Sequence, residues 1–163
     1  MSRMGIVSVM LDTSFCIRLM DANDNLPAHA LEYFRFFLQE KITIHLSTIV
    51  AAEYAVGDDP ENLPLNNLQI ETFDFRDAES AGLFHRELMG NKTNIAGYNR
   101  RIIANDVKIL AQIKNRKIDA IISKDVESIT RYVNPLINSN LLSMRFVDLN
   151  RSLNEELGEL FPF

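Results

Sequence analysis

The stretch IVSVMLDTSF, residues 6–15, decides the fold class of this 163-residue chain. Its first six residues form an almost unbroken apolar run, which is typical of a strand covered on both faces of a parallel sheet. The run ends abruptly at Asp12-Thr13-Ser14, where we expect a helix to begin at once. A buried strand that passes directly into a helix is the opening unit of an α/β fold, and it leaves an acid at the carboxyl end of the strand.

The rest of the chain repeats this alternation. Further strands are expected in ITIHLS, DAIIS and SMRFVDL (residues 42–47, 119–123 and 143–149), and QIETFDF (69–75) reads as a strand or an extended connector. Helices are expected in PAHALEYFRFFLQE, STIVAAEYAV, DAESAGLFHREL, IIANDVKILAQIK, VESITRYVNPL and SLNEELGEL (27–40, 47–56, 77–88, 102–114, 126–136 and 152–160), and GNKTNIAGYN (90–99) reads as a loop. The pattern predicts an α/β three-layer sandwich with a mostly parallel central sheet, in a single domain that spans residues 1–163.

Composition narrows the class of protein. With 47% hydrophobic and 24% charged residues, the chain resembles soluble globular proteins, and no apolar run approaches the roughly 20 residues of a membrane span. Asp12 interrupts the apolar start before a signal-peptide core is complete, and Cys16 is the single cysteine, so no disulfide forms within the chain. We therefore expect a cytoplasmic protein that does not enter the membrane.

Charge is distributed unevenly along the chain. The formal net charge is −5, but residues 92–131 carry nine Lys or Arg against four Asp or Glu. The cations of this basic segment lie on both sides of Asp106 and Asp125 in the sequence: Arg100, Arg101, Lys108, Lys114, Arg116, Lys117, Lys124 and Arg131. Positive charge beside acids suits a phosphate-bearing substrate such as nucleic acid, and the alternative is that these residues form the solvated faces of ordinary helices.

Asp106 stands out within the helix expected at residues 102–114. Ile102, Ile103, Ile109 and Leu110 recur at the three-and-four spacing of one helical face, and Asp106 falls in the middle of that apolar stripe. An ionised carboxylate in a protein core costs several kcal/mol unless it has a partner, so such a residue is usually paired or bound to a cation.

Three further acids occupy unusual positions. Glu53 lies one turn from Ile49, Val50 and Val56 and so projects from the apolar side of its expected helix. Asp12 and Asp125 each follow a buried strand, and the carboxyl ends of parallel strands meet at one edge of a sheet. The alternatives are that Asp12 and Asp125 are helix N-caps and that Glu53 and Asp106 are hydrogen-bonded boundary residues.

Four converging carboxylates would repel one another strongly, since two unit charges ~4 Å apart interact by about 4 kcal/mol at an effective dielectric constant near 20. Either raised pKa values or a divalent cation can relieve this repulsion. An all-oxygen cluster without His or Cys favours Mg²⁺ or Mn²⁺ over zinc. One or two such ions activate water for attack on phosphorus, so the natural reaction is phosphodiester hydrolysis.

Four segments resemble, in order and spacing, the motifs of the PIN-domain nucleases, and in particular the VapC ribonuclease toxins of bacterial VapBC toxin–antitoxin pairs. VMLDTSF is similar to the family's opening acid followed by a hydroxyl residue, and STIVAAEY to its Ser-to-Glu helix. ANDVKILA is similar to its Asn-Asp-x-x-Ile-Ala helix, and IISKD to its strand that ends in Thr/Ser-x-Asp. The match extends from residue 6 to about residue 130.

The resemblance implies a PIN-like fold in which Asp12, Glu53, Asp106 and Asp125 bind Mg²⁺ or Mn²⁺ and carry catalysis. Ser14 or Ser123 would assist through a hydroxyl group, and the cations Lys108, Arg100 and Arg101 would assist the substrate. It also implies cleavage of RNA, an antitoxin partner and a homodimer. Lys108 stands where the family usually has an apolar residue, and Glu127 where a further aspartate often follows. The resemblance is therefore compatible with either one or two metal ions.

The main alternative is a catalytically inactive PIN-like module that binds RNA or a protein. A haloacid-dehalogenase-type phosphatase needs a second Asp two residues after the first, where this chain has Ser14, and a receiver domain has no role for Glu53. For assembly, the phenylalanines of residues 27–40 and the apolar tail at Leu157, Leu160, Phe161 and Phe163 are either core or a patch for dimerisation or antitoxin docking.

Overall fold

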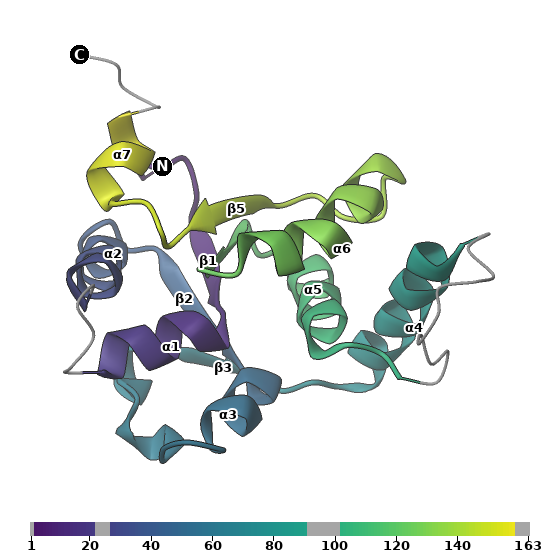
Figure 1. Cartoon of the computed structure of the whole chain (residues 1–163), viewed down its shortest axis with the longest axis horizontal. Coiled ribbons are helices and arrows are strands. Elements are labelled where there is room, and N and C mark those ends of the chain that lie inside the picture. The colour runs from purple at the N-terminus through teal and green to yellow at the C-terminus, as the bar shows by residue number, and fades with distance from the viewer. Residues whose placement is uncertain (1, 22–26, 91–101, 159–163) are drawn as a thin grey trace.

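The computed structural model describes residues 2–21, 27–90 and 102–158 (Figure 1). In these ranges one five-stranded sheet has the order β3-β2-β1-β4-β5, and every neighbouring pair is parallel. The strands are β1 (Ser8–Leu11), β2 (Thr43–Ser47), β3 (Gln69–Glu71), β4 (Ala120–Ser123) and β5 (Arg145–Asp148). The predicted α/β sandwich with a parallel central sheet is confirmed.

Helices cover both faces of this sheet, as Figure 1 shows: α1, α2 and α7 lie on one side, and α4, α5 and α6 on the other. The helices are α1 (Thr13–Met20), α2 (Pro27–Gln39), α3 (Thr48–Tyr54), α4 (Phe75–Met89), α5 (Asn105–Arg116), α6 (Val126–Asn138) and α7 (Leu153–Gly158), and two short 3₁₀ turns span Pro60–Asn62 and Leu65–Asn67. No helix in the described ranges has the length and apolar character needed to cross a bilayer.

The centre of the sheet is also where the strand order reverses. All four residues of β1 and all four of β4 are buried, as expected of strands between two helical layers. The chain moves from β1 to β2 and β3 on one side, then returns to β4 on the other. Leu11 pairs with Ile122, so Asp12 and Ser123 follow side by side at the carboxyl edge. Open α/β sheets bind ligands at such a switch point.

Two of the helix boundaries that differ from the sequence-based prediction bear on the candidate site. Helix α5 begins at Asn105, because Ala104 is extended, and Ile102 before it is 64% exposed. Asp106 therefore lies in the first turn of α5, at the start and not in the middle of an apolar stripe that continues with the buried Ile109 and Leu110. Helix α3 ends at Tyr54, so Val56 lies beyond it and is 90% exposed.

The aromatic residues of α2 form core. Phe34, Phe36 and Phe37 are buried, whereas Leu31 and Leu38 on the same helix are partly exposed. Leu157 of α7 packs against the core from the surface. The tail residues Leu160, Phe161 and Phe163 lie outside the described residues. Most of the phenylalanines predicted as core or docking patch are thus core.

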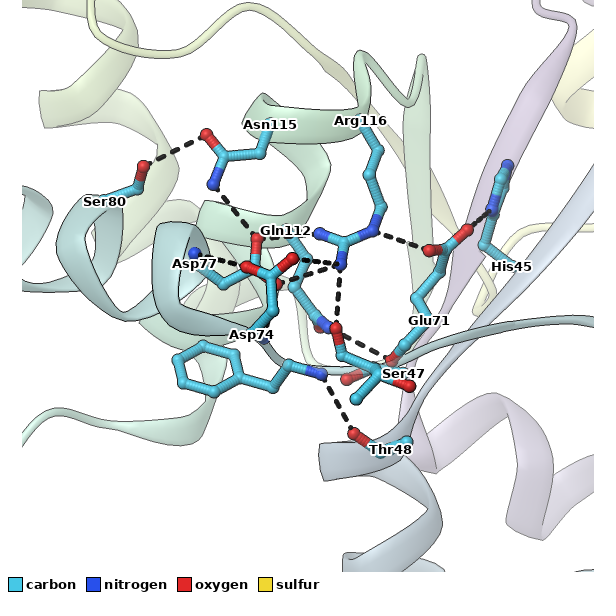
Figure 2. A network of polar contacts seen from close by, with 12 residues as sticks. His45, Ser47, Thr48, Glu71, Asp74, Asp77, Ser80, Gln112, Asn115 and Arg116 are labelled. Atoms are coloured by element: carbon cyan, nitrogen blue, oxygen red, sulfur yellow. Dashed lines mark hydrogen bonds and ion pairs between the residues drawn. The ribbon is translucent and has the colours of Figure 1, made fainter.

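A buried polar network joins the β3 edge of the sheet to α4 and α5 (Figure 2). The guanidinium of Arg116 donates to Glu71 Oε2 (2.6 Å), to both carboxylate oxygens of Asp77 (2.7 and 2.9 Å) and to the Thr72 carbonyl (2.8 Å). His45 Nδ1 lies 2.6 Å from Glu71 Oε1, and Asn115 Nδ2 donates to Asp77 Oδ1 (3.0 Å). Because Asp77 is fully buried, its charge needs these partners.

The network fixes the helix whose opposite end carries Asp106. Arg116 is the last residue of α5, and its partners come from β3 and α4. Gln112, one turn earlier, donates to the Glu71 carbonyl (3.1 Å). The C-terminal half of α5 is thereby bound to the sheet, which determines where its first turn lies.

Candidate active site

Asp12 is the most buried of the four predicted acids. It follows β1 directly, at the N-cap position of α1, and is only 6% exposed. Ser14 Oγ and Ser123 Oγ both donate to its Oδ2, at 3.0 and 2.6 Å. Two hydroxyl groups from different strand ends thus hold one carboxylate oxygen in place.

The same two serines connect the end of β1 to the turn after β4. Each hydroxyl proton is used on Asp12, so each oxygen is available as an acceptor. The backbone N–H of Lys124 donates to Ser14 Oγ (3.1 Å), and that of Asp125 donates to Ser123 Oγ (3.0 Å). Their observed contacts position Asp12 and the turn; direct assistance to a substrate stays a prediction.

Asp125 follows β4 at the N-cap position of α6 and is exposed. Like Asp12, it makes no side-chain capping hydrogen bond. The N-cap alternative therefore describes the position of both aspartates but not the contacts of their carboxylates.

Glu53 reaches the site from α3, the helix that follows β2. Its half-buried carboxylate accepts a hydrogen bond from Thr13 Oγ1 (3.2 Å). Burial raises the pKa of Glu53 above its ordinary value, the Thr13 hydrogen bond partly offsets this, and the charges of Asp12 and Asp106 raise the pKa further.

Asp106 enters from the first turn of α5. Ser128 Oγ of α6 donates to its Oδ2 (3.2 Å). Burial raises the pKa of Asp106, as do the charges of Asp12 and Asp125, while Ser128 and Arg131 lower it in part. Neither raised pKa has the sign expected of a carboxylate held by a permanent protein cation.

The four acids therefore belong to one electrostatic cluster. Asp106 is affected by Asp12 and Asp125, and Glu53 by Asp12 and Asp106. Their side chains nevertheless do not form a closed cage: across the described ranges, no three Asp, Glu, His or Cys side chains are grouped closely enough to hold a metal ion by themselves. The arrangement is an open array of carboxylates around a strand-end edge.

The cations of the basic segment have different surroundings. Arg116 is committed to Glu71 and Asp77, and Lys114 and Lys117 line a pocket next to Asp119, at the amino end of β4. Lys124 and Arg131 line a pocket with Asp125 and are near the acids.

Of the remaining cations, Lys108 is half-buried in the first turns of α5. Arg100 and Arg101 lie outside the described residues. The basic segment is therefore divided: Lys124 and Arg131 lie beside the acids, whereas Lys114, Lys117 and Arg116 lie at the opposite edge of the sheet or inside the buried network.

Two hydroxyl residues of the site were not singled out from the sequence. Thr13 contacts Glu53, and Ser128 contacts Asp106. Thr13 directly follows Asp12, and Ser128 lies in the first turn after Asp125, so a search for hydroxyl residues within three positions of each strand-end acid would have found both.

No protein-family model matches the chain, and no curated protein matches it in sequence. Among solved structures it is similar to a chain in the crystal structure of VapBC2 from Rickettsia felis bound to a DNA fragment from their promoter, with 17% identity and a TM-score of 0.59 over 86% of this chain and 99% of that chain. A chain in the crystal structure of DNA-bound VapBC from Salmonella typhimurium gives 19% identity and a TM-score of 0.55 over 88% and 99%. At these identities the likeness concerns the fold, and it agrees with the motifs at residues 6–130: the chain has the PIN-like fold of the VapC-like proteins.

Proposed function

We propose that the chain is a divalent-metal-dependent endoribonuclease that hydrolyses phosphodiester bonds of RNA. One observation carries the proposal: Asp12, Glu53, Asp106 and Asp125 come from four separate elements to the switch point of a parallel sheet, where Asp12 and Asp106 raise the pKa of Glu53, and Asp12 and Asp125 that of Asp106. A chain gains no stability from such an arrangement, because carboxylates that are buried together favour their neutral forms. A cation that binds between them removes the repulsion.

The residues fit Mg²⁺ or Mn²⁺ by their chemistry. All four side chains offer carboxylate oxygens, the donors that these hard cations prefer. The open spacing of the acids also suits Mg²⁺, which usually keeps several water ligands and is bound by one or two carboxylates. Asp12, with Oδ2 held by Ser14 and Ser123, is the best-positioned ligand, and hydrogen-bonded carboxylates of this kind are typical of metal sites.

In the proposed reaction, the protein orients the scissile phosphodiester bond against the acids. A bound metal ion would supply charge stabilisation at the phosphoryl oxygens and activation of the attacking water. Asp12 and Asp125 at the strand ends, with Glu53 and Asp106 from the flanking helices, would hold that ion. Thr13, Ser14, Ser123 and Ser128 would keep the carboxylates of Glu53, Asp12 and Asp106 from turning away.

The test is cleavage of labelled RNA and single-stranded DNA in Mg²⁺, in Mn²⁺ and in EDTA. Wild-type protein should cut RNA in metal and not in EDTA, and Asp106→Asn and Glu53→Gln should lose cleavage while keeping the fold. Glu79→Gln is the matched control, because Glu79 is an exposed residue of α4 away from the acids. Absence of cleavage by wild type, together with no rise in melting temperature on adding metal, would instead support the inactive module that binds RNA or a protein.

We further propose that the chain is the toxin of a toxin–antitoxin pair. The fold likeness to chains of VapBC complexes supports this, as does an exposed apolar surface beside Glu53. Ile17 (53% exposed), Met20 (39%) and Val56 (90%) line a pocket of about 560 Å³ there, together with Glu53. An antitoxin that covered this surface would also reach the acids.

Two experiments test the assembly. Co-expression with a neighbouring small reading frame should give a complex that Val56→Asp weakens, and sedimentation of the chain alone should give the homodimer predicted from the sequence. A chain that purifies alone under co-expression would contradict the antitoxin partner, and a monomer at micromolar concentration would contradict the homodimer.

A further inference from the structure

A second pocket, of about 680 Å³, opens beside the candidate active site on the α6 side of Asp125. Its walls include Lys124 from the turn after β4, Arg131 from α6 and Asn150 from the chain after β5. Asp125 lines it too, and Ser128 in its wall donates to Asp106 (3.2 Å). The pocket is thus continuous with the acids, and its volume lies within the roughly 300–1,000 Å³ of sites that bind small ligands.

The turn that carries Lys124 is fixed on both sides. Its backbone N–H donates to Ser14 Oγ (3.1 Å), and its carbonyl accepts a hydrogen bond from Asn150 Nδ2 (2.8 Å). Asn150 Nδ2 also donates to Asp148 Oδ1 (2.9 Å) at the end of β5. Because three strand ends hold this turn, the floor of the pocket is preformed, which lowers the entropic cost of binding.

Two cations in the pocket are available to an anion. Within the described ranges, neither Lys124 nor Arg131 forms an ion pair with a carboxylate, although Asp125 and Glu127 line the same pocket. The guanidinium of Arg131 lies 5.2 Å from the centre of the Tyr132 ring, a contact that orients it. Arg116, by contrast, uses its guanidinium on three carbonyl or carboxylate groups.

We propose that Lys124 and Arg131 bind a backbone phosphate of the RNA strand, next to the phosphodiester bond that faces the four acids. This subsite rests on the proposed ribonuclease function. The acids repel the phosphates of a strand, so a pair of cations one step along the strand is needed to hold it against them. Contacts to phosphate carry no sequence information but fix the register of the strand, and Arg131 therefore determines which bond reaches the acids.

The test uses a labelled 12-nucleotide single-stranded RNA in Mg²⁺, with Glu53→Gln in every protein to prevent cleavage. Glu53 lines the other pocket, so this change leaves the subsite intact. Adding Arg131→Gln should weaken binding about tenfold or more at low salt, the effect of losing one hydrogen-bonded charge contact. The slope of log affinity against log salt should fall by about 0.7, the value for one phosphate of a single strand.

Arg76→Gln is the matched control, since Arg76 is an exposed arginine of α4 and loses the same charge. Arg131→Lys should keep the salt slope. Replacing one phosphate at a time by a neutral methylphosphonate should identify a linkage that matters to the parent protein but not to Arg131→Gln. Equal affinity and slope for Arg131→Gln and Arg76→Gln, or equal sensitivity of both proteins to every methylphosphonate, would overturn the subsite.

The two proposals fail in different ways. If the parent binds RNA through Arg131 but the wild-type chain does not cleave it, the ribonuclease proposal fails and the phosphate subsite stands. If wild type cleaves RNA and Arg131→Gln cleaves it with unchanged KM and at the same bond, the ribonuclease stands and the subsite fails. Circular dichroism of Arg131→Gln checks the fold, which an exposed side chain should not affect.

Discussion

Replacing Arg116 by Met should destabilise the protein more than replacing an exposed charged residue. Arg116 has a side chain only 20% exposed, and its loss leaves Asp77 (1% exposed) and Glu71 (10%) without their cation. Breaking a buried ion pair from one side costs about 3–5 kcal/mol. The lower end applies here, because His45 still bonds Glu71 and Asn115 still bonds Asp77.

A loss of about 3 kcal/mol corresponds to a fall in melting temperature of roughly 6–12 °C for a chain of this size. Chemical denaturation at pH 7 measures the free energy of unfolding directly. Arg3→Met is the control, since Arg3 pairs with Glu40 while 61% exposed, and a surface pair of this kind contributes about 0–1 kcal/mol. Equal destabilisation by the two substitutions would refute the claim that Arg116 holds α4 and α5 to the sheet.

The pH dependence of stability tests the role of Arg116 independently. Burial alone would raise the pKa of Asp77, but the hydrogen bonds from Arg116, the Asp74 backbone and Asn115 bring it below the ordinary value. In wild type, the stability that Asp77 contributes through its lowered pKa is fully present above the unfolded pKa of about 3.9 and is lost as the pH falls further. In Arg116→Met, burial dominates and the carboxyl gains stability on protonation. The difference in unfolding free energy between wild type and Arg116→Met should therefore become smaller from pH 7 to pH 4. A constant difference would contradict the pairing of Arg116 with Asp77.

The remaining predictions concern the site. In EDTA at pH 7, Asp106→Asn should be more stable than wild type by about 1 kcal/mol, because a carboxyl with a raised folded pKa loses stability as the pH rises through it. The difference should vanish below about pH 4, as urea denaturation at both pH values would measure. Ser123→Ala removes a donor to Asp12 and the acceptor of the Asp125 N–H; it should cost about 1.5–3 kcal/mol and weaken Mn²⁺ binding, measured by calorimetry, about 10–100-fold. Cys16 is buried, and burial together with the Asp12 charge raises the pKa of its thiol to about 12. A thiol reagent at pH 8 should therefore label Cys16 only in denaturant, and rapid labelling of the native protein would contradict this.

The sequence predicts the central strands because β1 and β4 lie in almost unbroken apolar runs, whereas the edge strand β3, Gln69–Glu71, has only one apolar residue. β1 and β4 are buried along their whole length, so their runs could hardly be anything but central strands. The start of α5 was not predictable from periodicity, since Ile102 and Ile103 match the helical spacing although the helix begins after Ala104. The spacing of apolar residues shows which residues share a face if the segment is helical, but it does not show where the helix begins.

The candidate site also has features that were predictable from the sequence and features that were not. Strand-end acids were predictable because parallel strands end at a common edge, and this brings Asp12 and Asp125 together regardless of side-chain detail. The Arg116 network was not predictable, because Arg116 meets Glu71 and Asp77 from positions 45 and 39 residues away. Local patterns carry no information about such pairs, so the sequence shows Arg116 only as one cation of the basic segment, whereas the fold pairs it with Glu71 and Asp77.

Asp12 and Asp125 differ from the other polar residues that directly precede helices in the described parts of the chain. Ser47 caps α3, Asp59 caps the turn Pro60–Asn62, and Asp74 caps α4 in a reciprocal capping box. Asp12 and Asp125 occupy the same position before α1 and α6 but make no cap hydrogen bond. A cap stabilises a helix by typically ~1 kcal/mol, so these two residues forgo a gain that three others in the chain obtain. They forgo it at an edge where the charges of Asp12 and Asp106 raise the pKa of Glu53, and the charges of Asp12 and Asp125 raise that of Asp106. A purely structural role at both positions would predict capping hydrogen bonds instead. Asp12 instead accepts hydrogen bonds from Ser14 and Ser123, and the proposed cation would offset both the missing caps and the repulsion among the acids.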